Sequence, residues 1–184
     1  MHLPVLSTSN LVLRPIDDGD TAALFHHFSD DTVTKYMDID SFSNISEATH
    51  IIELFRKSLE EEEGTRWAIT VAGNDELIGT CGYHKINKPH FKAEIGYDLR
   101  PAFWGKGIMK EAISCMLTYG YEELQLNRIE AFVDPENIAS SKLLSRLGFH
   151  YEGFLRDAFF EKGKFVNAEL YSLLRHEHTR ESIY

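Results

Sequence analysis

The stretch Trp104-Gly-Lys-Gly-Ile108 lies between a strand-like segment that ends at Leu99 and a helix-like segment. From Lys106 to Gly120, apolar residues recur at three- and four-residue spacing, which predicts an amphipathic helix packed on a sheet. The entry to a helix offers unpaired backbone N–H groups at the positive end of the helix dipole, and glycines let a ligand approach them. The stretch predicts a β–loop–α unit with an anion site, although a tight turn without a ligand has the same pattern.

Two other phosphate-binding loops have different residues. A dinucleotide-binding loop of the Rossmann type needs a third glycine at position 110, where this chain has Lys110. A P-loop needs a GxxxxGK segment followed by Ser or Thr, and the sequence has none. A nucleotide-binding domain of either type is therefore disfavoured.

The segments before the loop predict strands and helices in the order β α α β β β. The expected elements are a strand at Leu11–Pro15, a helix that ends near Phe28, a helix capped by Ser46 that ends before Gly64, a hairpin of 66–72 and 76–85 turning at Gly73–Asp75, and a strand at 93–99.

After the loop helix the order continues β α β β. The expected elements are a strand at Arg128–Val133, a helix from Asn137 to Leu147-Gly148, and strands at 149–155 and 168–174 that meet at a tip, Glu161–Lys164. Repeats and linkers are absent, so residues 1–184 are expected to form a single mixed α/β (α+β) domain.

Composition and charge exclude several protein classes. The chain has 184 residues, 43% of them hydrophobic, which suffices for a core without disulfides. Its 19 Lys and Arg against 29 Asp and Glu give a net charge of −10, which disfavours nucleic-acid binding and would attract cationic amines. Two cysteines, Cys81 and Cys115, encode neither a disulfide framework nor a metal site. With no export signal or membrane span, a cytoplasmic protein is expected.

A second motif completes a longer pattern. Asn137-x-x-Ser140 precedes Leu147-Gly-Phe149, while Ala93-Glu-Ile-Gly-Tyr97 and Leu126-Asn-Arg-Ile-Glu130 flank the loop helix. Together with Pro101-x-Phe-Trp-Gly-Lys-Gly107, these residues resemble the GNAT-superfamily N-acetyltransferases of the RimJ/RimL-like branch, over roughly residues 11–174. The match is most specific from Lys92 to Gly153.

The resemblance implies a single GNAT-like domain with a mostly antiparallel sheet of six to seven strands. The sheet would be splayed between the strands that end at Leu99 and Val133, with helices on both faces. It also implies acetyl-CoA as co-substrate and no metal. The expected cofactor-binding residues are Tyr97, Leu99, Trp104, Gly105, Lys106, Gly107, Ile108, Asn137 and Ser140.

Two positions depart from the family pattern. Ala102 stands where relatives often have Gln or Arg at the start of the loop, so only backbone groups remain there. Leu144 stands where many relatives have the tyrosine that protonates the leaving thiolate. A non-catalytic acyl-CoA-binding module is therefore kept as an alternative to an enzyme.

Acetyl transfer to an amine needs a neutral nucleophile and a stabilised thiolate. The proposed catalytic residues are Glu94, as a base acting through water, and Ser140, as a donor to the thiolate. Glu94 could instead pair with Arg100 or Arg128, and Ser140 could serve only as a pantetheine contact or in the helix cap. The expected acceptor is a primary amine, foremost a protein N-terminus, with a polyamine, aminoglycoside or amino acid as the alternative. A homodimer is left open.

Overall fold

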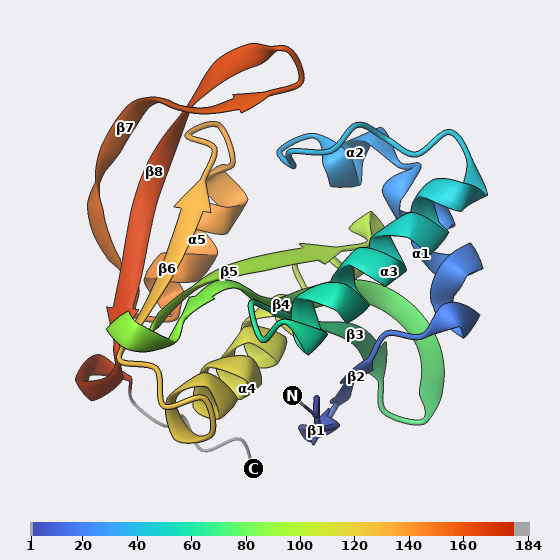
Figure 1. The fold of residues 1–184 in the computed structure, drawn as a ribbon, viewed down its shortest axis with the longest axis horizontal. Coiled ribbons are helices and arrows are strands. Elements are labelled where there is room, and N and C mark those ends of the chain that lie inside the picture. Colours follow the sequence, from blue (N-terminus) through green and yellow to red (C-terminus); the bar gives the residue numbers. More distant parts are fainter. Residues whose placement is uncertain (1, 179–184) are drawn as a thin grey trace.

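The computed structural model describes residues 2–178, so residue 1 and residues 179–184 of the predicted domain 1–184 lie outside the described residues. Eight strands form one sheet in the order β1-β2-β3-β4-β5-β6-β8-β7 (Figure 1). The strands are β1 (Leu6–Ser7), β2 (Leu11–Pro15), β3 (Thr65–Val71), β4 (Asn74–Asn87), β5 (Lys92–Leu99), β6 (Arg128–Val133), β7 (His150–Glu161) and β8 (Lys164–Leu174).

The structure confirms the mixed α/β fold. The sheet has eight strands where six to seven were predicted, and the additional strand is the short β1. β1 has two residues and pairs antiparallel with β2. Two residues are too few to show the alternation from which a strand is predicted. Only the β5–β6 pair is parallel among the described pairs of neighbouring strands.

Within residues 2–178, five α-helices and four short 3₁₀ segments accompany the strands. The helices are α1 (Thr21–Phe28), α2 (Asp31–Thr34), α3 (Ile45–Glu60), α4 (Ile108–Glu122) and α5 (Ile138–Arg146), and the 3₁₀ segments are Asp18–Asp20, Lys88–His90, Pro101–Phe103 and Arg175–Glu177. Helix α2 is one turn long and was not predicted, because its four residues carry no helical period.

The predicted cap of α3 is wrong by two residues. Asn44, not Ser46, caps this helix: its Oδ1 accepts a hydrogen bond from Ser46 N at 2.9 Å, and Glu47 Oε2 accepts one from Asn44 N at 2.7 Å. This reciprocal arrangement satisfies two backbone donors at once, which a cap at Ser46 would not do.

Helices cover both faces of the sheet, as predicted. One core cluster packs Met109, Ile113 and Met116 of α4 against Trp67 and Ile69 of β3. The other packs residues of α1 and α3 against Ala68 of the same strand. Because neighbouring residues of a strand point to opposite faces, the two clusters lie on opposite sides of the sheet.

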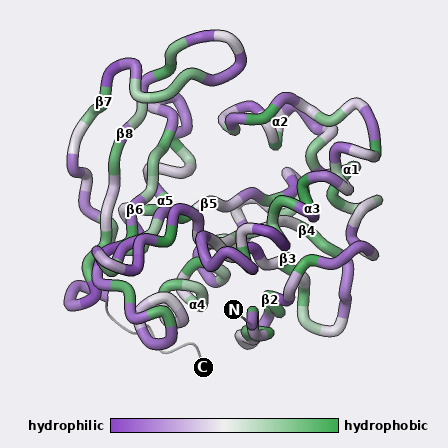
Figure 2. The backbone as a smooth tube through the Cα atoms, viewed as in Figure 1, coloured by the Kyte–Doolittle hydropathy of each residue, from purple (hydrophilic) through white to green (hydrophobic). Residues whose placement is uncertain are grey.

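The β7–β8 hairpin is longer than predicted. Its tip lies at the predicted residues, between Glu161 and Lys164, but β7 continues from 155 to 161 and β8 begins at 164 instead of 168. Phe160 and Phe165, each 66% exposed, pack against each other near the tip. Hydrophobic and hydrophilic segments both occur along this hairpin (Figure 2). The extended hairpin reaches toward α2 in Figure 1.

Candidate active site

The glycine loop forms an open approach to the N-terminus of α4. Gly105 and Gly107 have positive φ angles of 72° and 80°, and no atom lies within 4 Å of where a Cβ would stand on either residue. Gly107 caps α4 without any side-chain hydrogen bond to the first turn. Its left-handed backbone explains why the helix begins at Ile108 and not at the predicted Lys106. Loop and helix end together suit an anion.

Trp104 fastens this loop to the end of β5. Its Nε1 donates a hydrogen bond to the carbonyl oxygen of Leu99 at 2.6 Å, while half of the residue remains exposed. The Lys106 Nζ lies 5.4 Å from the centre of the Phe103 ring. The backbone of Leu99 was predicted to contact a cofactor, and its carbonyl oxygen already accepts this hydrogen bond within the protein.

Strands β5 and β6 part beyond their first residues. They pair only from Lys92 opposite Arg128 to Glu94 opposite Glu130, although β5 runs to Leu99 and β6 to Val133. This is the predicted splay. Arg100 N donates to the Ile78 carbonyl of β4 at 2.8 Å. The N–H and C=O groups of successive residues in a strand point to alternate sides. The backbone groups of Tyr97 therefore point away from β4, toward the opening between β5 and β6.

Two predicted residues meet at the opening. The Tyr97 hydroxyl of β5 lies 2.6 Å from Ser140 Oγ in the first turn of α5. Asn137 caps that helix, and its Oδ1 accepts a hydrogen bond from Ser140 N at 3.2 Å. Burial raises the pKa of Tyr97 to about 12, so its hydroxyl keeps its proton at neutral pH. The contact between the two side chains joins segments 43 residues apart and was not predicted.

Glu94 lies on the other face of β5. Its Oε2 is 3.0 Å from Lys85 Nζ and 3.4 Å from His84 Nε2. These are not the arginines considered from the sequence, since Arg100 pairs with Glu76 and Arg128 with Glu130 and Glu152. Burial acts to raise the pKa of Glu94, but the contacts with His84 and Lys85 outweigh it and lower the pKa.

The two proposed catalytic side chains therefore approach β5 from opposite faces. Glu94 shares a face with Asp98, whereas Tyr97 and its partner Ser140 lie on the side of α4. The structure brings Ser140 to Tyr97 and does not bring it to Glu94. An acid and a base on opposite faces suit a reaction in which a nucleophile enters from one side of a carbonyl and a leaving group departs on the other.

A buried polar network behind Glu94 was missed by the sequence analysis. The Asp98 carboxylate contacts His27 Nε2 at 2.6 Å, Arg66 at 2.5 Å and the Thr80 hydroxyl at 2.6 Å. In the His27 ring, Nε2 contacts Asp98, whereas Nδ1 has no hydrogen-bond partner among residues 2–178. The one available signal was a histidine beside Leu24 and Phe28 on the apolar side of α1, and nothing in the sequence identifies its partner.

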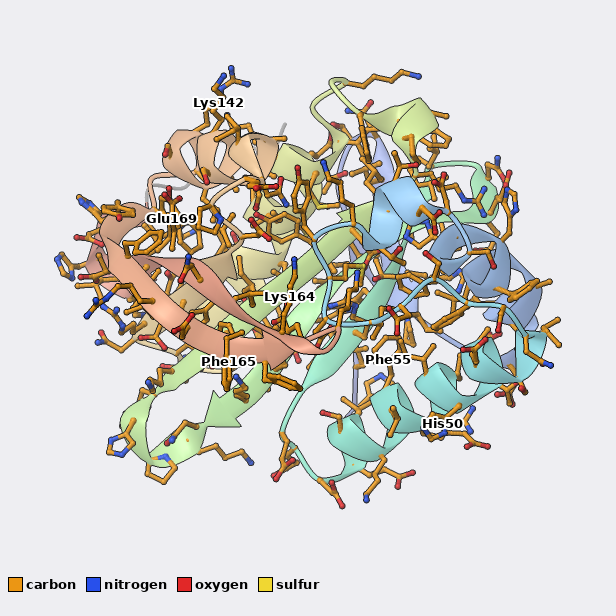
Figure 3. All side chains as sticks on the ribbon, turned by 90° about the horizontal axis from the view of Figure 1, so that it is seen from above. His50, Phe55, Lys142, Lys164, Phe165 and Glu169 are labelled. Carbon is orange, nitrogen blue, oxygen red and sulfur yellow. The ribbon has the colours of Figure 1, made fainter. Side chains whose placement is uncertain are left out.

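The tip of the β7–β8 hairpin contacts the end of α2. Lys162 Nζ donates a hydrogen bond to the carbonyl oxygen of Thr34, at the end of α2, at 2.8 Å. Burial, followed by the carboxylates of Asp38 and Asp134, raises the pKa of the neighbouring Glu161. Asp134 directly follows β6, so these acidic groups lie near the C-terminal end of that strand. Figure 3 labels Phe165 and Lys164 at this tip, and Lys142 pointing outward from α5.

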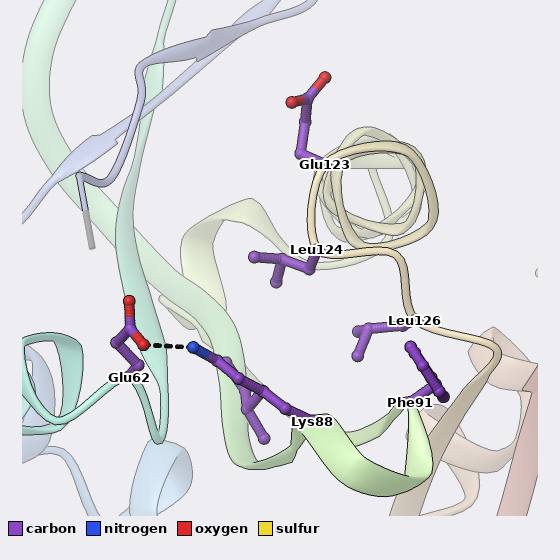
Figure 4. A pocket seen from close by; sticks show the side chains of 7 residues that line it. Glu62, Lys88, Phe91, Glu123, Leu124 and Leu126 are labelled. Carbon is purple, nitrogen blue, oxygen red and sulfur yellow. Dashed lines mark hydrogen bonds and ion pairs between the residues drawn. The ribbon is translucent and has the colours of Figure 1, made fainter.

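One pocket lies away from the glycine loop. A cavity of about 320 Å³ is lined by Ile86, Phe91, Leu124 and Leu126, with Lys88 paired to Glu62 at its rim (Figure 4). It adjoins the C-terminal end of α4, whereas the glycine loop adjoins the N-terminal end. It holds none of the residues predicted for the site.

Metal and membrane signals can be assessed for residues 2–178. In that part of the chain, no three His, Cys, Asp or Glu side chains are grouped as metal ligands would be. None of its helices combines the length and apolar character that crossing a membrane requires.

A glycine loop at a helix N-terminus, beside a parallel strand pair that splays, defines the class of GNAT-fold acyltransferases. The family described as "Acetyltransferase (GNAT) domain" matches residues 10–150. The chain belongs to this family and is an N-acetyltransferase.

Three relatives illustrate the similarity. An uncharacterized N-acetyltransferase, p20, of Bacillus licheniformis is 42% identical over 176 residues, covering 96% of this chain and 99% of its own. The "Putative ribosomal N-acetyltransferase YdaF" of Bacillus subtilis (strain 168) is 34% identical, covering 69% and 68%. The Vibrio cholerae spermidine N-acetyltransferase, solved with CoA and spermine, has a TM-score of 0.80 and 26% identity, covering 92% and 98%.

Proposed function

We propose that this protein transfers the acetyl group of acetyl-CoA to a primary amine, foremost the α-amine of a protein N-terminus, as in the RimJ/RimL-like branch. Acetyl-CoA would supply the acetyl group as a thioester. The backbone N–H groups of residues 104–108 would hold its pyrophosphate, the backbone of Tyr97 would pair with the pantetheine arm, and Asn137 and Ser140 would face the pantetheine and the thiol. The open space at Gly105 and Gly107 and the splay beyond Glu94 suit a ligand of that length and charge.

The observation that carries the choice of amine is the environment of Glu94. A carboxylate whose pKa is lowered by Lys85 and His84 is a weak base. An α-amine with a pKa of about 7.7 to 8.0 is partly neutral at pH 7, whereas a lysine amine lies roughly 2.5 units higher and costs about 3.5 kcal/mol more to deprotonate. A weak base therefore favours the α-amine.

The roles proposed for Glu94 and Ser140 follow from their positions on opposite faces of β5. Glu94, through water, would accept the proton that the amine loses as it attacks the carbonyl directly in a ternary complex. Ser140, on the other face, would stabilise the thiolate that departs. Both substrates must then be bound together, and no acetyl group is transferred to the protein.

A second acceptor class is a small cationic amine such as a polyamine, an aminoglycoside or an amino acid. The carboxylates of Asp38 and Asp134 lie close enough to Glu161 to raise its pKa, with Lys162 as the neighbouring cation, and this excess of carboxylates would favour a cationic acceptor. The bound spermine in the Vibrio cholerae structure belongs to a relative of the same fold.

An amine panel tests the proposal through release of free CoA thiol. The panel contains peptides with Ser and Ala N-termini, the same peptides blocked at the N-terminus but with a free lysine, spermidine, an aminoglycoside and free amino acids. We expect the highest kcat/KM for a free N-terminus. Activity confined to spermidine would move the assignment to the second class, and no thiol release with any amine, in a protein that binds acetyl-CoA, would contradict the enzyme proposal.

We further propose that the protein works in the cytoplasm, where Cys81 and Cys115 stay as free thiols. Whether it forms a homodimer stays a prediction, which light scattering at two protein concentrations would decide.

A further inference from the structure

The Tyr97 and Ser140 hydroxyls form a pair across the opening beside β5. Tyr97 belongs to the strand that leaves β6, and Ser140 to the helix that follows β6, so their 2.6 Å contact spans the two sides of the splay. The cap residue Asn137 fixes the backbone of Ser140. The backbone of Ser140 is thus fixed by Asn137 and its hydroxyl is contacted by Tyr97, which restricts the orientations of that hydroxyl.

The geometry allows either hydroxyl to donate, and acidity favours Tyr97 as the donor. A phenol is a stronger acid than an aliphatic alcohol and is therefore the better donor, and burial keeps Tyr97 protonated throughout the neutral range. When Tyr97 donates to Ser140 Oγ, the proton of Ser140 must point to a third group. Accepting one hydrogen bond also strengthens the bond that Ser140 donates.

The surrounding hydroxyls are committed to other partners. Tyr171 of β8 donates to Glu169 Oε2 at 2.8 Å, and Ser141 donates to the same oxygen at 3.2 Å. Leu144, one turn along α5, is fully buried in the core and offers no polar atom. Among residues 2–178, Ser140 is thus the α5 side chain that both reaches Tyr97 and can present a proton to the splay.

We propose that Tyr97 is a positioning residue that directs the hydroxyl proton of Ser140 toward the sulfur of the departing CoA thiolate. This inference rests on the proposed function. As the bond from the amine nitrogen to the acetyl carbon forms, the carbon–sulfur bond breaks and its electron pair stays on sulfur. Ser140 donates a hydrogen bond to that charge, and the surplus proton of the amine leaves through water. The pair replaces the tyrosine that position 144 lacks.

Kinetics of four variants test the pair. We expect Ser140→Ala to lower kcat about a hundredfold and Tyr97→Phe about fivefold to tenfold, each with the KM for acetyl-CoA within about twofold of wild type. The double variant should be no slower than Ser140→Ala, because both changes remove one interaction. Ser141→Ala, next along the helix and bonded to Glu169, is the matched control and should behave as wild type. If the losses in kcat of Tyr97→Phe and Ser140→Ala multiply in the double variant, the proposal is overturned. A change in the KM for acetyl-CoA with unchanged kcat would also overturn it.

Binding provides a readout that needs no turnover. A hydrogen bond to sulfur lowers the pKa of the bound CoA thiol, which is about 8.5 for a free thiol, so CoA should bind more tightly as pH rises from 6 to 8.5. Calorimetry with desulfo-CoA, which lacks the thiol, should show no such rise. We expect the rise to shrink in Tyr97→Phe and to vanish in Ser140→Ala.

Other groups near the pair are controlled in the same experiment. Tyr171 and Glu169 of β8 are the titratable side chains that act on the pair or on its neighbour Ser141. Ser141→Ala should leave the pH effect intact. Equal pH dependence for CoA and desulfo-CoA would overturn the inference even if acetyl transfer is fast. Conversely, a thiol-specific rise without acetyl transfer would retain the pair and reject the proposed function.

Discussion

His27 and Asp98 connect helix α1 to strand β5 inside the protein, with 2.6 Å between His27 Nε2 and Asp98 Oδ1 and side chains that are only 0% and 3% exposed. Arg66 and Thr80 contact the second oxygen of the same carboxylate. A buried carboxylate is stable only when such partners compensate for its lost hydration. The network thereby fixes α1 and β3 against the strand that carries Tyr97 and Glu94.

Replacing Asp98 should therefore destabilise the protein. We expect Asp98→Asn to lower the free energy of unfolding by about 3 kcal/mol, because Arg66 is left without its charge partner at a nearly buried site. Urea denaturation at pH 7 measures the effect. Asp75→Asn is the matched control: Asp75 also pairs with an arginine, Arg14, but its side chain is 84% exposed, so little change is expected. Equal effects of the two substitutions would contradict the role given to the buried network.

The same carboxylate should make stability depend on acid pH. Burial acts to raise the pKa of Asp98, but the charge of Arg66 and the hydrogen bond with His27 lower it overall. The unfolded chain then binds this proton near pH 3.9, whereas the folded chain binds it only at lower pH. The contribution of Asp98 to stability is complete above about pH 5 and is lost as pH falls through the folded pKa.

This prediction is measured as the difference in unfolding free energy between wild type and Asp98→Asn. We expect a constant difference from pH 7 to pH 5 and a decline below about pH 4. A difference that already declines between pH 7 and pH 5 would show that another group, such as His27, governs the network.

Local patterns predicted the elements of this fold well, and contacts between distant segments were the part that they could not predict. The periodicity from Met109 to Gly120 and the glycines at 105 and 107 are short-range signals, and they predicted α4 and its loop to within two residues. The hydrogen bond between Lys162 and Thr34 joins positions 128 residues apart. No residue near either position indicates the other.

The candidate site shows the same division. Tyr97 and Ser140 were each predicted, from motifs, as cofactor contacts, and the structure adds that they contact each other. Glu94 was predicted from its strand, but its partners on β4 were not: His84 lies directly opposite Glu94 in the regular register, and Lys85 lies within the register shift between His84 and Asn87. An irregular register cannot be derived from alternation alone.

Charge placed in the glycine loop should abolish cofactor binding. Gly105→Glu and Gly107→Glu put a carboxylate where the pyrophosphate of acetyl-CoA is proposed to bind, and we expect affinity to fall more than about a hundredfold. Each change also costs about 1 to 2 kcal/mol of backbone strain at positive φ. Gly73→Glu is the control, since Gly73 has a φ of 84° and open space but lies in the β3–β4 turn. Calorimetry that finds unchanged acetyl-CoA affinity in either folded loop variant would refute the anion site.

Glu94→Gln should have an effect that depends on the acceptor. With an N-terminal peptide we expect kcat/KM to fall less than about a hundredfold, because an α-amine is partly neutral without help. With a lysine or polyamine acceptor the loss should be larger. Glu130→Gln is the control, since Glu130 lies opposite Glu94 on β6 and pairs with Lys92 and Arg128. A loss of several thousandfold with the peptide, in a folded variant, would instead make Glu94 an obligatory direct base.

Salt should affect the two substrates in opposite senses. The net charge of −10, with Asp38, Asp134 and Glu161 near the C-terminal end of β6, should concentrate a cationic acceptor there. Raising salt from about 20 to 300 mM shortens the Debye length from roughly 20 Å to about 6 Å, so the KM of the acceptor should rise. Acetyl-CoA is an anion held against the same field, and its KM should stay level or fall unless Lys106, Lys110 and Lys142 dominate near the loop.

The double variant Asp134→Asn/Glu161→Gln isolates the local part of this effect. It should raise the acceptor KM at low salt and flatten its salt dependence, because the nearest carboxylates are gone. Glu122→Gln/Glu123→Gln removes the same charge at the C-terminal end of α4, the end opposite the glycine loop, and should leave the acceptor KM close to wild type. An acceptor KM that is flat with salt in the wild type would mean that the acidic surface serves solubility alone. Equal responses of the two double variants would assign the attraction to net charge and not to the residues near the C-terminal end of β6.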